Sequence, residues 1–103
     1  MACYSKPFNL AREYHIEVEY ADLGEWDVDE LHSEYDPDGP VIRINTRTME
    51  RLPSTETDRF IALAVGHELY HHREHRGEVP RLATRAARES AADNFARSLL
   101  QES

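Results

Sequence analysis

The sequence has almost no cysteine. Cys3 is the only thiol among 103 residues, so neither a disulfide framework nor a thiolate zinc finger can form within one chain. Any metal ion would therefore have to be bound by nitrogen and oxygen atoms.

Long apolar runs are also missing. The first 20 residues lack the continuous apolar stretch of a signal peptide, and no later run approaches the roughly 20 apolar residues of a membrane span. We therefore expect a cytoplasmic protein with no membrane partner. Apolar residues make up 40% of the chain and charged residues 31%, which is typical of a globular protein. The length suits one modest core, so we expect a single domain over residues 1–103.

Positive charge is scarce in the first half of the chain. Residues 1–58 carry 5 Lys and Arg against 14 Asp and Glu, whereas residues 59–103 carry 7 against 6. Nonspecific nucleic-acid binding needs clustered positive charge. The charge distribution therefore argues against a direct nucleic-acid partner.

The first 45 residues predict a small sheet. Ile16, Val18 and Tyr20 alternate with glutamates, which is the pattern of a strand buried on one face. Leu31–Tyr35 and Val41–Asn45 flank a turn rich in Asp, Pro and Gly and predict a hairpin. We expect the three strands to form an antiparallel sheet.

Helices surround this sheet in the sequence. Residues 5–14 predict a short helix, and apolar residues recur at helical spacing from Thr55 onward. That second helix should end near Gly77, because Pro80 bars continuation. Residues 84–101 predict another long helix with an apolar stripe. The predicted fold class is α+β, with the two long helices packed on each other.

The second helix carries the sequence His67-Glu68-Leu69-Tyr70-His71, an HExxH motif. Histidines four residues apart lie on one helix face about 6 Å apart along the axis, so their rings can converge on one ion. Catalytic zinc is bound by such nitrogens and keeps a position for water. Glu68 follows His67 directly and therefore lies about 100° round the helix axis from it, where its carboxylate can reach that water as a general base.

Two further histidines in the cluster fit less well. His75 lies roughly 12 Å from His67 along the helix axis, too far to share one ion, and His72 points away from the face of His67 and His71. We therefore expect His72 and His75 to be surface residues or to stand behind the ligands.

The third protein ligand must come from elsewhere. An extended HExxHxxGxxH motif would need glycine at position 74 and histidine at position 77, but the chain has Glu74 and Gly77. Glu89 and Asp93 lie four residues apart on the last predicted helix. Glu89 can complete a His, His, Glu set, while Asp93 accepts the free N–H of a ligand histidine.

Three segments together resemble the ImmA/IrrE family of zinc metallopeptidases. "YDPDGPVIRIN", "HELYHH" and "ESAADNFARSLL" are similar, in order, to that family's edge strand, active-site helix and following helix. The resemblance implies a minimal gluzincin-like zincin fold, with His67, His71 and Glu89 as metal ligands, Glu68 as base and Asp93 behind a ligand. It also implies a protein substrate, commonly a phage- or mobile-element-type repressor with a helix-turn-helix.

We therefore expect a zinc-dependent metalloendopeptidase with one Zn²⁺ ion. Val41–Asn45 would bind the substrate by strand addition if it borders the cleft. Two histidines and a carboxylate also suit iron(II) or manganese. The alternatives are a noncatalytic protein-interaction module stabilised by metal and a metal-free helical protein. The candidate oxyanion donors, among which the sequence does not choose, are Tyr35, Tyr70, His32 and His72.

Overall fold

The chain folds as an α+β unit. A computed structural model describes residues 4–24 and 32–101. In chain order, the elements of these residues are α1 (Lys6–Glu13), β1 (Glu17–Ala21), β2 (Ser33–Asp36), β3 (Val41–Asn45), α2 (Thr46–Arg51), α3 (Ser54–His75) and α4 (Arg85–Leu99). The predicted fold class and the two long helices are confirmed. Leu31, where the predicted hairpin begins, lies outside the described residues.

The sheet is mixed, so the prediction of an antiparallel sheet is wrong. Its strand order is β1-β3-β2, with β2 antiparallel to β3 and β1 parallel to β3. The hairpin of β2 and β3 is confirmed. β3 is the most apolar strand, and its residues Val41, Ile42 and Ile44 are buried. The central position in the sheet suits it, because a neighbouring strand on each side shields these side chains from water. β1 and β2 carry carboxylates, which suit the edges of a sheet.

One face of the sheet is polar. Arg43 lies opposite Glu19 on one side and Glu34 on the other, and it forms ion pairs with them at 3.4 and 3.2 Å. Val18 on β1 is partly buried, whereas Tyr20 is 50% exposed. The predicted burial of Tyr20 is therefore wrong, because β1 is an edge strand.

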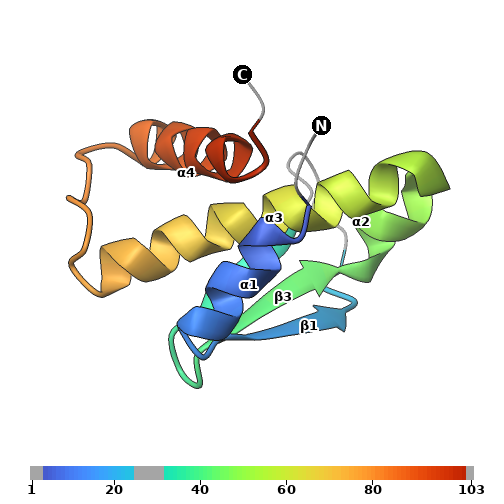
Figure 1. The fold of residues 1–103 in the computed structure, drawn as a ribbon, viewed down its shortest axis with the longest axis horizontal. Helices are drawn as coiled ribbons and strands as arrows, with labels where there is room; N and C mark the ends of the chain where they lie inside the picture. Colours follow the sequence, from blue (N-terminus) through green and yellow to red (C-terminus); the bar gives the residue numbers. More distant parts are fainter. Residues whose placement is uncertain (1–3, 25–31, 102–103) are drawn as a thin grey trace.

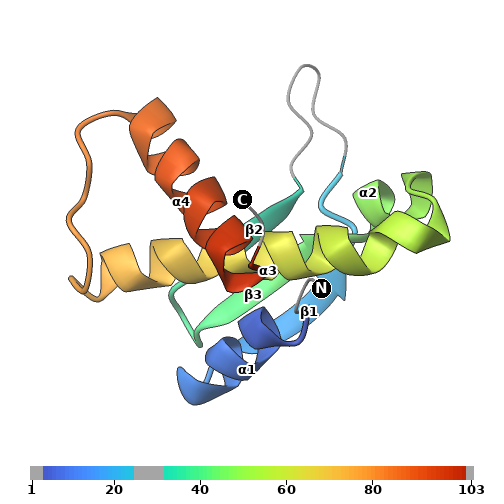
Figure 2. The same ribbon diagram turned by 45° about the horizontal axis from the view of Figure 1, so that its top comes forward.

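α3 lies between the sheet and α4. Figure 1 shows the sheet on one side of α3 and α4 on the other, and Figure 2 shows α4 crossing α3 at an angle. Residues from all these layers form the core, the fully buried ones including Ile42, Ile44, Val65, Leu69 and Leu100. α3 therefore presents one face to the sheet and another to α4. None of the helices in the described part of the chain is long and apolar enough to cross a membrane.

A short helix, α2, joins the sheet to α3 and was not predicted. Its N-cap is Asn45, a fully buried side chain. The amide oxygen of Asn45 accepts hydrogen bonds from the backbone N–H groups of Leu23 and Arg47, both at 3.1 Å. Its nitrogen donates to the carbonyl of Gly24 at 3.2 Å. These bonds satisfy a helix terminus and fix the corner through which the chain enters α3.

Candidate metal centre

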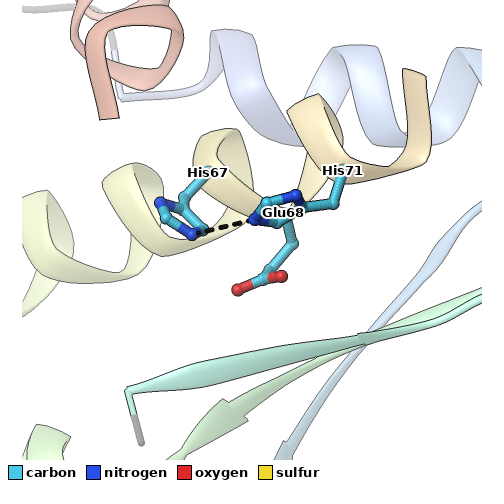
Figure 3. Close-up of side chains that lie close together, drawn as sticks. All are labelled: His67, Glu68 and His71. Atoms are coloured by element: carbon cyan, nitrogen blue, oxygen red, sulfur yellow. Dashed lines mark hydrogen bonds between the residues drawn. The ribbon is translucent and has the colours of Figure 1, made fainter. Parts of the chain in front are cut away.

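The two motif histidines converge on one point. His67 and His71 lie on successive turns of α3, and their Nε2 atoms are 3.2 Å apart (Figure 3). Together with Glu68 they offer ligand atoms that all lie within 4.8 Å of one another. This group could hold a metal ion, and the helical spacing of the motif is what brings it together.

Glu89 reaches the same point from α4. Its Oε2 lies 2.7 Å from His67 Nε2 and 3.4 Å from His71 Nε2. α4 starts at Arg85 after a Thr84 cap, whose hydroxyl accepts from the backbone N–H of Ala87. Glu89 therefore stands one turn into α4, facing the two histidines. Its side chain is 40% exposed, so the point of convergence is open to solvent on one side.

Both motif histidines are held by carboxylates on their other ring nitrogen. Asp93 Oδ1 lies 2.8 Å from His67 Nδ1, and Glu74 Oε1 lies 2.7 Å from His71 Nδ1. A carboxylate accepts hydrogen bonds, so Asp93 and Glu74 each favour a proton on the Nδ1 atom that they contact. With its proton on Nδ1, a histidine ring can offer the lone pair of Nε2 to a metal ion at the point where the two rings meet.

Asp93 was predicted for this position, but Glu74 was not. In the sequence, Glu74 stands where the extended HExxHxxGxxH motif would need glycine. Its spacing, three residues after His71 on the same helix, is a signal that could have identified it. Hydrogen bonds from Arg88 hold the pKa of Glu74 below its usual value. Its carboxylate is therefore ionised and able to accept from His71.

Glu68 points from α3 toward the sheet (Figure 3). It is 5% exposed, and the hydroxyl of Ser33 on β2 donates a 2.6 Å hydrogen bond to its Oε2. Burial raises the pKa of Glu68, although Ser33 and the two histidines favour its ionised form. A carboxylate with a raised pKa suits proton transfer near neutral pH. Ser33 was not predicted, because no local pattern connects it to a residue 35 positions later.

A cleft borders this group on two sides. One hollow, of about 550 Å³, has an apolar wall that includes Phe60, Leu63 and Ala96. A second hollow of about 360 Å³ is lined by more polar groups. The residues that line both hollows are Glu68, His71 and Glu89. An extended ligand could therefore cross the histidine pair from one hollow to the other.

The strand that borders the cleft is β2. Val41–Asn45 was expected to bind substrate by strand addition if it bordered the cleft, but β3 is the central strand and both its sides are paired. The condition is not met, and the edge strand implied by the family resemblance is wrong for these residues. Ser33 and Glu34 of β2 line the larger hollow, and β2 is the edge beside α3. The error follows from the order of the strands, which the hairpin pattern does not determine.

The remaining histidines lie apart from the convergence point. His72 is buried rather than on the surface, and its Nδ1 is 2.6 Å from the hydroxyl of Tyr35. His75 is exposed, as one alternative predicted. His32 lines the larger hollow. Among the candidate oxyanion donors, Tyr35 is engaged with His72 and Tyr70 is buried.

Close approach of α3 and α4 brings the donors together, and it depends on Gly66. A Cβ added there would lie 3.0 Å from both Cα and Cβ of Ala96. Since one of these atoms is backbone, Gly66→Ala should push α4 away. We expect a cost of about 1–3 kcal/mol from overpacking, partly offset by about 1 kcal/mol of helix propensity. The affinity of this group for a metal ion should also fall, because Glu89 and Asp93 move with α4.

Urea unfolding of the metal-free protein and competition with a chromophoric zinc chelator measure these two effects. Ser90→Ala, at an exposed position of α4, is the control and should change neither. Unchanged stability and affinity in Gly66→Ala would show that the two helices accept the methyl group without moving.

The structure thus places all five predicted site residues in one region. His67, Glu68 and His71 form the group that could hold an ion, Glu89 faces both histidines and Asp93 bonds to His67. His72 and His75, which were predicted not to be ligands, lie away from the point where these side chains meet. No protein-family model, curated protein or solved structure matches this chain, and the family resemblance of its motifs therefore stays a prediction.

Proposed function

We propose that this protein is a zinc-dependent metalloendopeptidase with a gluzincin-like centre. In this proposal, His67, His71 and Glu89 bind one Zn²⁺ ion, Glu68 is the general base and Asp93 positions His67. The observation that carries this proposal is that the Nε2 atoms of His67 and His71 on α3 and a carboxylate oxygen of Glu89 on α4 converge on one point. Beside them lies the buried carboxylate of Glu68, which accepts a hydrogen bond from Ser33.

The spacing of the donors supports a tetrahedral ion. Ligands roughly 2.0–2.1 Å from a tetrahedral zinc lie about 3.3 Å from one another. Two of the three donor separations, 3.2 and 3.4 Å, match this value. The third, between His67 Nε2 and Glu89 Oε2, is 2.7 Å, so a small movement of the half-exposed Glu89 would complete the site. Nitrogen and oxygen donors without thiolate also suit zinc.

Glu89 is a better third ligand than Glu68, although Glu68 also lies near both histidines. The Oε2 atom of Glu89 is directed at both Nε2 atoms. Glu68 is instead buried and accepts a hydrogen bond from Ser33. A purely structural site has no need of an additional buried carboxylate beside three ligands, whereas hydrolysis needs one.

The proposed reaction is hydrolysis of a peptide bond. A bound zinc ion would supply an acidified water and polarise the carbonyl of the scissile bond. Glu68 takes a proton from the attacking water as the new C–O bond forms at the carbonyl carbon. It then gives that proton to the departing nitrogen as the C–N bond breaks. Ser33 holds the Glu68 carboxylate in place between these two transfers.

The proposed substrate is a protein segment in extended conformation. β2 is an edge strand whose residues Ser33 and Glu34 line the cleft, and exposed edges bind extended peptides by strand addition. The cleft continues on both sides of the histidine pair, as cleavage within a chain requires. A helix-turn-helix repressor of the phage or mobile-element type is the substrate that the family resemblance suggests.

Metal content and cleavage together test the proposal. The protein, purified without added metal and dialysed against micromolar zinc, should hold one ion per chain. It should cleave members of a peptide library, detected by mass spectrometry, or a repressor encoded beside it. A chelator should abolish cleavage, and zinc should restore it. Absence of bound zinc would reject the metal centre. Bound zinc without cleavage of any peptide or of that repressor would favour the interaction module, with the acidic residues 1–58 as its docking region.

A further inference from the structure

The second ligand histidine is connected to α4 through a pair of charged residues, Glu74 and Arg88. Glu74 lies on α3 with its side chain 4% exposed. Its Oε1 pairs with His71 Nδ1 at 2.7 Å. Arg88 donates from Nε to Oε2 at 3.1 Å and from Nη2 to Oε1 at 3.2 Å. Both carboxylate oxygens are therefore occupied.

The buried carboxylate of Glu74 would destabilise the fold if it had no hydrogen-bond partners. Burying an ionised carboxylate is unfavourable, and two charge-assisted hydrogen bonds from one guanidinium offset that cost with a defined geometry. The planar fork of Arg88 leaves Glu74 little freedom to rotate. The oxygen that faces His71 is consequently fixed in position as well as ionised.

The pair also joins the two helices that supply the ligands. Glu74 follows His71 by three residues on α3, and Arg88 directly precedes Glu89 on α4. The Nδ1 atom of His67 contacts Asp93, whose side chain is 57% exposed. The His71 side of the centre is therefore the more buried and the more firmly connected of the two.

We propose that Glu74 and Arg88 are a positioning pair for His71. Glu74 keeps the imidazole proton on Nδ1 and directs the Nε2 lone pair toward the point where Glu89 and His67 meet. Arg88 holds Glu74 in the orientation that does this. Both residues also line the smaller hollow, and the role proposed for them is their contact with His71. The inference rests on the proposed function only in naming the metal as the partner of Nε2, because the tautomer of His71 is a property of the metal-free protein.

Glu74→Leu tests the pair without opening a large cavity. It removes the acceptor but keeps an apolar side chain of similar size. Arg88 is 26% exposed, so its guanidinium can reach water once Glu74 is gone. The His71 ring then loses the contact that selects its tautomer. We expect its proton to move wholly or partly to Nε2, from which it must be displaced before zinc binds.

Two measurements follow this change. Long-range ¹H–¹⁵N correlation spectra of the metal-free protein should show the Nδ1–H tautomer of His71 in the wild type and loss of its predominance in Glu74→Leu. Chelator competition should show zinc affinity lowered by about 10–100-fold, the range for residues behind metal ligands. Glu74→Gln, whose amide oxygen can still accept, should recover part of the affinity. Arg88→Leu should lower it by a smaller factor than Glu74→Leu does, because Arg88 acts on His71 only through Glu74.

Arg85→Ala is the matched control, since Arg85 is an exposed arginine at the start of the same helix. It should leave the tautomer and the affinity unchanged. If the Leu variants melt at a lower temperature but keep the wild-type tautomer and zinc affinity, the pair only stabilises the fold and the proposal is overturned. Whichever of Glu74→Leu and Arg88→Leu folds is sufficient for this decision. If the wild type binds no zinc, the proposed function fails, and the tautomer comparison alone decides the role of Glu74.

Discussion

Glu68→Gln should retain zinc and lose peptide hydrolysis. The expected fall in kcat is about 10²–10⁴-fold, the contribution typical of a positioned general base. Glutamine has nearly the same shape, so its amide oxygen can still accept the hydrogen bond from Ser33. It cannot take a proton from water at neutral pH. The loss should therefore appear in the chemical step rather than in folding or metal binding.

Zinc affinity by chelator competition and cleavage rates on the best library peptide measure the two parts of this prediction. Glu56→Gln provides the control, because Glu56 is an exposed carboxylate in the first turn of the same helix. It should behave as the wild type. If the cleavage rate of Glu68→Gln is within threefold of the wild-type rate, Glu68 is not the general base.

His71→Ala should nearly abolish zinc binding. Residues behind metal ligands contribute about 10–100-fold in affinity, so loss of a direct ligand should cost more than about 100-fold. Stability should follow by mass action, since a ligand at 100 times its Kd stabilises the folded protein by about 2.7 kcal/mol. Zinc should thus raise the melting temperature of the wild type and leave that of His71→Ala nearly unchanged.

Chelator competition and thermal unfolding with and without zinc measure this effect. His75→Ala is a stringent control, because His75 is an exposed histidine on the same helix, four residues after His71. It should keep the wild-type affinity. Equal losses in both variants would mean that zinc binds the histidine-rich helix end without a defined ligand set.

The local features of this protein were predictable from the sequence. The spacing of His67 and His71 fixes their common face, because the geometry of a helix is the same in every context. The hairpin of β2 and β3 follows from a turn segment between two strand patterns. Even Glu89 and Asp93 could be placed on one face of the last helix from their spacing of four residues.

Contacts between distant segments were not predictable in the same way. The parallel pairing of β1 with β3 depends on which strand takes the centre of the sheet, and that is decided by burial on both sides of Val41–Asn45. The burial of His72 against Tyr35 and the hydrogen bond from Ser33 to Glu68 join residues more than 30 positions apart. No periodicity within one element contains that information.

The sequence by itself determined which side chains can serve as ligands and base, because the HExxH spacing sets their positions relative to one helix. Only the tertiary structure decided that these side chains meet a carboxylate from α4, since Gly66 and Ala96 allow the two helices to approach closely. It also decided that Glu74 and Arg88 connect His71 to that second helix. The reason is physical: backbone geometry fixes spacing within a helix, whereas the packing of side chains fixes the distance between helices.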